Sequence, residues 1–195
     1  MLLPVLATVA IYLLNPLGTA TADPRARLFG YMVVRLPSVA MAPTLSPGDI
    51  LFVDTTAYWR SEPKPGDVLV YQDPVPPFGA RLHRVAAVPG DRVDVRDGNL
   101  WVNGEQIGTP LDDGDWPTTV GVLENFEIPD DRYFVVGDNP LHSADSRLWG
   151  TLPRDNLIGR ATRVISGARP GPLPPWSRRP ATVASKTLGI AFTQP

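Results

Sequence analysis

Proline and glycine interrupt this chain so often that little of it is left for long helices. They supply 23 and 17 of its 195 residues, about a fifth of the chain against a usual share of roughly 12%. Apolar residues make up 43%, more than a chain disordered along its whole length carries. The length suffices for one domain with a hydrophobic core. The composition therefore predicts a mostly β domain that is rich in turns.

The tripeptide Pro-Gly-Asp occurs three times, at residues 47–49, 65–67 and 89–91, each time between apolar runs. Proline presets a negative φ and glycine accepts a positive φ at the next position, so each copy predicts a turn that leads into a strand. The dipeptides Asp-Gly at 97–98 and Asn-Gly at 103–104 are typical of hairpin turns.

Runs of β-branched and aromatic residues lie between these turns, and such residues favour strands. We expect strands at residues 31–36, 50–54, 68–71, 81–88, 92–95, 100–102, 133–136 and 161–165. No long stretch after residue 30 has helical periodicity. The expected fold is therefore mostly β, with antiparallel sheets behind a hydrophobic amino-terminal segment.

Residues 1–22 carry no charged side chain and are strongly apolar. This length suffices for a membrane anchor. The small residues Ala20 and Ala22 also fit an export signal that is cleaved before Asp23, although the basic region that usually begins such a signal is missing. A buried core segment is the third alternative. The expected organisation is an anchor or export signal at 1–22, a β domain at 23–167 with a possible insertion at 105–130, and a proline-rich linker and tail at 168–195.

Several kinds of chemistry are excluded or disfavoured by composition. The chain has no cysteine, which excludes disulfides, cysteine-ligated metals and thiol nucleophiles. A formal net charge of −2 argues against nucleic acid as a partner. The two histidines and the carboxylates have no ligand spacing, and no glycine-rich phosphate loop is present. We therefore predict no metal and no cofactor.

Three segments carry motifs in a fixed order. Residues 37–45 are Pro-Ser-Val-Ala-Met-Ala-Pro-Thr-Leu, and residues 81–91 run from Arg-Leu-His-Arg-Val to Pro-Gly-Asp. The third segment combines Gly-Asp-Asn at 137–139 with Ser-Ala-Asp-Ser-Arg at 143–147. Together these motifs resemble type I signal peptidases, the membrane-anchored serine proteases that remove export signals. The resemblance covers about residues 31–165.

In that family a serine directly before the methionine attacks the substrate carbonyl, and a lysine, or in some members a histidine, acts as the base. Here Ala40 precedes Met41, and His83 has the position of the base. A methyl group has neither a proton to lose nor a lone pair, and the loss of a nucleophile typically costs about 10⁶ in turnover. The chain is therefore an inactive relative, a nucleophile-to-alanine variant of an active protein, or an enzyme that uses another hydroxyl.

The resemblance also implies roles for neighbouring residues. Ser38 shares the face of Ala40 on an extended backbone, which suits an oxyanion donor. Ser143 and Asp145 have the positions that support the base, and Arg147 suits a bidentate pair with Asp145. His142 lies outside the motif and is expected in a surface loop, with a second imidazole of the site as the alternative. The implied substrate-binding residues are Val33, Val34, Arg35, Leu36, Met41, Arg81 and Leu82.

The resemblance implies a membrane-bound serine endopeptidase that cleaves preproteins after Ala-x-Ala, with the β domain on the extracytoplasmic side of a single-pass membrane protein, at the plasma membrane if bacterial. Its partners are then signal-peptide-bearing preproteins and, through residues 1–22, membrane lipid. The alternative is a catalytically inactive relative that binds signal peptides or a membrane partner without cutting. A structural β domain is the third hypothesis. Arg25 and Arg27 follow the apolar segment, which by itself favours a cytoplasmic carboxyl side, so the sequence leaves the orientation open.

Overall fold

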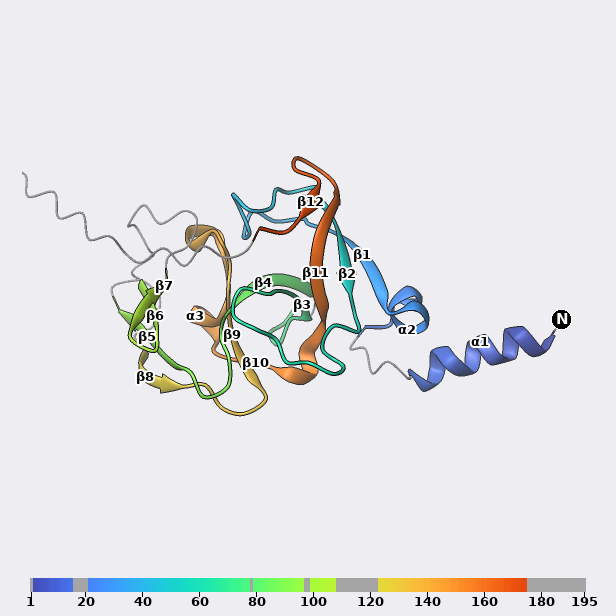
Figure 1. The fold of residues 1–195 in the computed structure, drawn as a ribbon, viewed down its shortest axis with the longest axis horizontal. Helices are drawn as coiled ribbons and strands as arrows, with labels where there is room; N and C mark the ends of the chain where they lie inside the picture. Colours follow the sequence, from blue (N-terminus) through green and yellow to red (C-terminus); the bar gives the residue numbers. More distant parts are fainter. Residues whose placement is uncertain (1, 16–20, 78, 97–98, 108–122, 175–195) are drawn as a thin grey trace, which may run out of the picture.

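Two antiparallel sheets form the body of this chain, whose structure is a computed structural model that describes residues 2–15, 21–77, 79–96, 99–107 and 123–174. The Asp-Gly dipeptide at 97–98, the middle of the expected insertion and the end of the expected tail lie outside the described residues. The small sheet lies at one end of the body and helix α1 (Leu2–Leu14) at the other (Figure 1).

The large sheet has the strand order β1-β2-β11-β3-β4-β9-β10, with β12 paired to β11. Its strands are β1 (Tyr31–Arg35), β2 (Ile50–Asp54), β3 (Val68–Gln72), β4 (Ala80–Ala87), β9 (Arg132–Val136), β10 (Leu152–Pro153), β11 (Leu157–Ser166) and β12 (Gly171–Pro172). The small sheet has the order β7-β6-β5-β8, formed by β5 (Arg92–Arg96), β6 (Asn99–Val102), β7 (Glu105–Ile107) and β8 (Leu123–Glu127). All eight expected strands are present, so the prediction of a mostly β fold is confirmed.

Two segments are more ordered than the sequence indicated. Strands β7 and β8 lie in the expected insertion at 105–130, and both belong to the small sheet. Strand β12 lies in the expected tail and pairs with Arg163 and Val164 of β11. The described part of each segment is therefore joined to a sheet by backbone hydrogen bonds.

The described helices are α1, α2 (Pro24–Phe29), α3 (Ser146–Trp149) and the 3₁₀ turns η1 (Pro140–His142) and η2 (Arg154–Asn156). Helix α2 was not expected from periodicity because it is only six residues long. It begins with the cap residue Asp23, whose carboxylate accepts from the Arg25 amide, and ends at Gly30 with φ 75°. In the part of the chain that the structure describes, no helix is long and apolar enough to cross a membrane.

The three Pro-Gly-Asp turns are built alike. Their glycines, Gly48, Gly66 and Gly90, have φ of 92°, 96° and 83°, as the sequence predicted. In each copy the aspartate carboxylate accepts from the backbone N–H three residues earlier, and the aspartate N–H donates to the carbonyl of that same residue. This reciprocal pair closes the turn, and in all three cases the chain then enters a strand.

The large sheet is covered by apolar clusters on both faces. One cluster joins Val68, Val70 and Leu82 to the buried loop residues Met41 and Leu45. The other joins Leu69, Tyr71, Val85, Tyr133, Val135 and Leu152. Because successive side chains of a strand point to opposite faces, β3 and β4 contribute to both clusters. From Leu82 to Ala87, a side chain of β4 is therefore buried whichever face it enters.

Candidate active site

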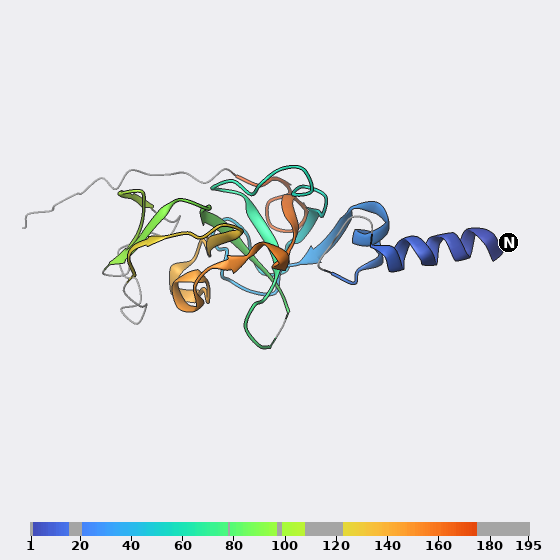
Figure 2. The same cartoon turned by 90° about the horizontal axis from the view of Figure 1, so that it is seen from below.

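Two strand edges that are open to hydrogen bonding face a groove. Strand β1 is at the end of the strand order and pairs with β2 alone. Residues 80–83 of β4 pair with β3 alone among the described strands, because β9 joins β4 only from Arg84 onward. A groove of about 520 Å³ is lined by residues of both edges. Figure 2 shows the molecule turned by 90°, with α1 again at one end of the β body.

Most of the predicted site residues line this groove. They are Ser38, Ala40 and His83, together with Val34, Arg35, Leu36, Arg81 and Leu82. Two predicted substrate contacts do not. Met41 is fully buried in the core cluster below. Val33 points to the face of β1 opposite Val34, because side chains alternate along a strand.

The segment that carries Ala40 is fixed by a loop distant in sequence. The Ala40 carbonyl accepts from the backbone N–H of Asn139 at 2.9 Å, and the Val39 carbonyl accepts from the Asn139 side chain at 3.2 Å. Any side chain at Gly137 would overlap both the Ala40 carbonyl and the Ser143 hydroxyl. Glycine at this position thus lets the first and third motif segments approach each other closely.

His83 uses both of its ring nitrogens. Nδ1 lies 2.7 Å from the Tyr71 hydroxyl, and Nε2 lies 3.2 Å from the Ser143 hydroxyl. The side chain is buried, with 2% of its surface exposed. Burial lowers the pKa of His83 to about 4, and this effect exceeds the raising influence of Asp145. At neutral pH the imidazole is therefore uncharged.

Asp145 reaches His83 through Ser143. The Ser143 hydroxyl donates to Asp145 Oδ2 at 2.6 Å, and the Gly137 N–H donates to the same oxygen at 2.9 Å. Arg147 makes a bidentate pair with the carboxylate, at 2.7 and 2.5 Å. Burial opposes ionisation of Asp145, but the Arg147 guanidinium, with His83 and Ser143, holds the pKa of this carboxyl below its ordinary value.

His142, the second histidine of the chain, lies at the groove. His142 is exposed, as expected of a loop residue, and it also lines the groove. Its Nδ1 lies 3.3 Å from the Asn139 side-chain oxygen. Among the described residues, no three histidine or carboxylate side chains are grouped so that they could hold a metal ion.

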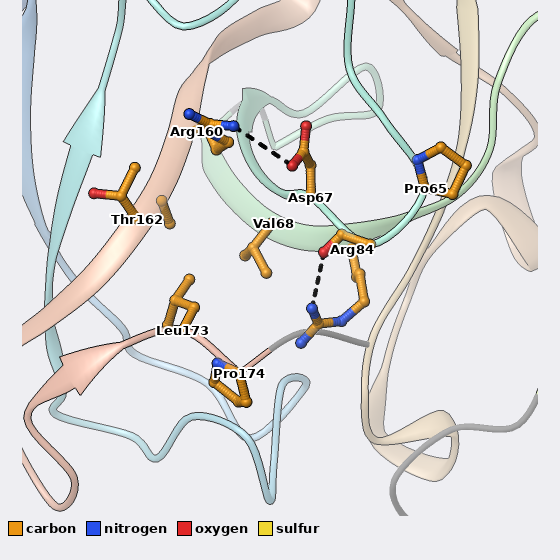
Figure 3. Close-up of a pocket in the computed structure, with 10 residues that line it drawn as sticks. Pro65, Asp67, Val68, Arg84, Arg160, Thr162, Leu173 and Pro174 are labelled. Carbon is orange, nitrogen blue, oxygen red and sulfur yellow. Dashed lines mark hydrogen bonds and ion pairs between the residues drawn. The ribbon is translucent and has the colours of Figure 1, made fainter. Parts of the chain in front are cut away.

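A second cavity, of about 690 Å³, lies where β3, β4 and β11 adjoin (Figure 3). It is lined by Asp67, Arg84 and Arg160, together with Leu173 and other residues. None of the predicted site residues lines it. We therefore assign the candidate site to the groove between β1 and β4 and not to this larger cavity.

The sequence did not reveal Tyr71, Gly137 or Asn139 as parts of the site. Tyr71 lies diagonally across the β3–β4 pairing from His83, which is opposite Leu69, and such diagonal pairs are within reach of aromatic side chains. The pairing register that creates this contact depends on both strands, so no motif around Tyr71 indicates it. Gly137 and Asn139 belong to the third motif, but their contacts with Val39 and Ala40 span about a hundred residues.

The sequence of this chain matches a known family. A model of the family "Signal peptidase, peptidase S26" matches residues 11–165. The chain therefore belongs to the signal peptidase S26 family.

Similar curated proteins carry related names. The chain is 33% identical to probable signal peptidase I-1 of Synechocystis, over 78% of this chain and 80% of that protein. It is 34% identical to probable signal peptidase I-2 of Synechocystis, over 65% and 59% of the two chains. It is also 34% identical to thylakoidal processing peptidase 1 of Arabidopsis thaliana, over 65% of this chain and 39% of that protein. A crystal structure of a signal peptidase I from Enterococcus faecalis aligns with 52% of this chain and 98% of that one, at 25% identity and a TM-score of 0.43.

Proposed function

We propose that this chain recognises the signal region of exported preproteins as an extended strand, in the manner of a signal peptidase I. The observation that carries the proposal is the groove between two open strand edges, β1 and residues 80–83 of β4. A peptide laid between them gains backbone hydrogen bonds from both sides, while the pockets between alternate side chains give specificity.

The walls of the groove suit small apolar side chains. Val34, Leu36 and Leu82 supply apolar surface, and Ala40 and Ala80 lie in the same groove. A substrate that presents alanine at two alternating positions places both side chains on this face, which agrees with an Ala-x-Ala preference. By the family resemblance, we also place the β body on the extracytoplasmic side of a membrane, held through residues 1–22.

The bond-breaking step is where this chain departs from the family. An acyl-enzyme requires a nucleophile, and the Ala40 side chain supplies none. Ser38 lines the same groove, but it precedes Ala40 by two residues. The backbone between them is not extended as the sequence predicted, because Val39 lies in a bend and Ala40 in a turn, and Ser38 does not have the position of residue 40. These observations favour the second candidate, a relative that binds signal peptides without cutting them through residue 40.

A binding measurement tests the proposed recognition. A fluorescent peptide that spans an Ala-x-Ala cleavage region should bind the unmodified chain, measured by anisotropy. Val34→Trp fills the groove and should weaken binding by about tenfold or more, which corresponds to about 1.4 kcal/mol. The matched control Ile165→Trp changes an exposed residue of β11 that does not line the groove, and should leave the affinity within about twofold.

Two outcomes would contradict the proposal. Equal binding by Val34→Trp and Ile165→Trp would show that the groove does not hold the peptide. Cleavage of a preprotein by the unmodified chain, abolished by Ser38→Ala, would show that another hydroxyl replaces residue 40 as the nucleophile and would exclude the non-cutting candidate.

A further inference from the structure

The His83 imidazole is enclosed by hydrogen-bonding partners that come from three different segments. Tyr71 is on β3, His83 is on β4, and Ser143 and Asp145 are in the loop that leads into α3. Tyr71 is fully buried, and its ring lies 5.9 Å from the His83 ring at an angle of 42°. Trp149 of α3 packs against the ring of Tyr71 at 6.2 Å. Neither ring of the Tyr71–His83 pair is therefore free to turn away from the other.

The proton on Ser143 determines the direction of the hydrogen bond to Nε2. A hydroxyl has one proton to donate, and that of Ser143 is committed to Asp145 Oδ2 at 2.6 Å. Arg147 and Ser143 help to hold the pKa of Asp145 below its ordinary value despite burial, so this carboxylate is ionised and only accepts. Ser143 must then accept the bond from His83 at 3.2 Å. Nε2 therefore carries the imidazole proton.

The protonation of Nε2 determines that of Nδ1. A neutral imidazole has one N–H, so with the proton on Nε2 the other nitrogen, Nδ1, has only a lone pair. The Tyr71 hydroxyl lies 2.7 Å from it and donates. Burial raises the pKa of the Tyr71 phenol well above its ordinary value, and Asp73 and Asp145 act in the same direction, so the donor keeps its proton.

The other tautomer of His83, with the proton on Nδ1, would lose two favourable hydrogen bonds. With the proton on Nδ1, Tyr71 would have to accept, and its own buried proton has no other acceptor among the described contacts. Ser143 would have to donate to Nε2 and give up its bond to the ionised Asp145, which is the stronger because one partner is charged. A buried hydroxyl without a partner is costly, so only one direction of the chain of bonds satisfies every group.

We propose that Tyr71 and Ser143 together hold His83 as a neutral imidazole with its proton on Nε2 and its lone pair occupied, so that His83 is a hydrogen-bond donor and not a base. Tyr71 is then a positioning residue of the site, because it acts through His83. The proposal deepens the proposed function, since a site whose base position has no available lone pair binds a peptide without accepting a proton. Burial, with contributions from Arg81 and Arg147, lowers the pKa of His83 to about 4, against the raising effect of Asp145 and Asp138, in agreement with the neutral state.

The chain offers a clean spectroscopic test because it has only two histidines. Nitrogen-15 NMR of the side chains, assigned with His142→Gln, reports which nitrogen of His83 carries a proton. At pH 7 we expect one tautomer, protonated on Nε2. The Nδ1 resonance should also be displaced from that of a free lone pair, because Tyr71 donates to it. A proton on Nδ1, or on both nitrogens, would overturn the proposal without any substitution.

Two variants distinguish the effects of Tyr71 and Ser143 on His83. Tyr71→Phe should move the Nδ1 resonance toward the value of a free lone pair, whereas Tyr133→Phe, a second buried tyrosine bonded to Glu62, should leave it in place. Ser143→Ala should convert the single tautomer into a mixture. A folded Tyr71→Phe protein with an unmoved Nδ1 resonance would refute the role of Tyr71. The measurement needs no peptide, so its failure is distinct from failure of the peptide-binding test.

Discussion

His83 and Arg84 are neighbours on β4, but their side chains enter opposite faces of the large sheet. Both side chains are buried, Arg84 in an ion pair and His83 as a neutral ring. Arg84 is paired with a carboxylate, because Nε and Nη2 donate to Asp138 at 2.8 and 2.6 Å. Nη1 donates to the Gly66 carbonyl at 2.9 Å (Figure 3). His83 gives up its charge and bonds as a neutral ring to Tyr71 and Ser143. The free-energy cost of burying an ionisable group is reduced either by an oppositely charged partner or by loss of the charge. Arg84 therefore belongs to a structural ion pair, whereas His83 is a residue of the candidate site.

The largest effect is expected from breaking the ion pair. Arg84→Met leaves the Asp138 carboxylate buried without its partner, and such a change typically costs about 3–5 kcal/mol of the free energy of unfolding. Urea denaturation measures this cost. The double variant Arg84→Met with Asp138→Leu removes both charges and should recover much of the loss, because an apolar pair replaces a buried ion pair at little cost.

The control for Arg84 is an exposed pair of the same chemistry. Arg92 and Glu127 are 2.9 Å apart, with side chains 52% and 60% exposed. Arg92→Met should change the free energy of unfolding by less than about 1 kcal/mol, as is usual for surface pairs. If Arg84→Met costs no more than Arg92→Met, the pair of Arg84 and Asp138 does not hold β4 against the 137–139 loop.

The sequence predicts such a comparison only in part. The strands follow from β-branched runs, and the Pro-Gly-Asp turns follow from the backbone preferences of proline and glycine, since both are local properties. The motifs also identified Ala40, His83 and Ser143 as neighbours. The contact of Arg84 with Asp138 spans 54 positions, and that of Tyr71 with His83 depends on strand register. Neither can be derived from one segment alone, because packing of the whole sheet creates both.

The next effect is a pH dependence of stability that is due to His83. Its pKa is about 4 in the folded protein and about 6.5 in an unfolded chain. Between these values the unfolded state binds more protons than the folded state. The free energy of unfolding therefore rises with pH across this window, and the stabilisation is lost as pH falls from about 6.5 to about 4. A difference of about 2.5 units corresponds to roughly 3 kcal/mol over the whole window.

Denaturation at a series of pH values measures this slope. His83→Gln should reduce the slope between pH 4 and 6.5, whereas His142→Gln, a change at an exposed histidine, should keep it. The pKa of Asp145 lies below its ordinary value, so its stabilisation is lost only at still lower pH and does not overlap with the window of His83. An unchanged slope in His83→Gln would mean that this imidazole is not buried neutral.

The last prediction concerns general base catalysis, for which the neutral, doubly hydrogen-bonded imidazole of His83 has no lone pair available. Ala40→Ser supplies a hydroxyl in the groove, but the imidazole at the base position, His83, is already a donor to Ser143. We therefore expect slow cleavage of an Ala-x-Ala preprotein by this variant. Adding His83→Lys replaces the occupied ring by an amine, whose pKa burial lowers, and whose neutral form accepts a proton. Cleavage should rise by about 100-fold, the lower range of general base catalysis.

The matched control for this pair is His83→Lys with Ala40 unchanged, which has the amine but no hydroxyl and should yield no product. Product formation is followed by mass spectrometry of the preprotein, so that cleavage after the second alanine is distinguished from proteolysis elsewhere. If Ala40→Ser alone cleaves as fast as the double variant, His83 accepts protons as readily as an amine does. His83 would then be a base and not only a donor, because the imidazole would have a lone pair available in spite of Tyr71 and Ser143.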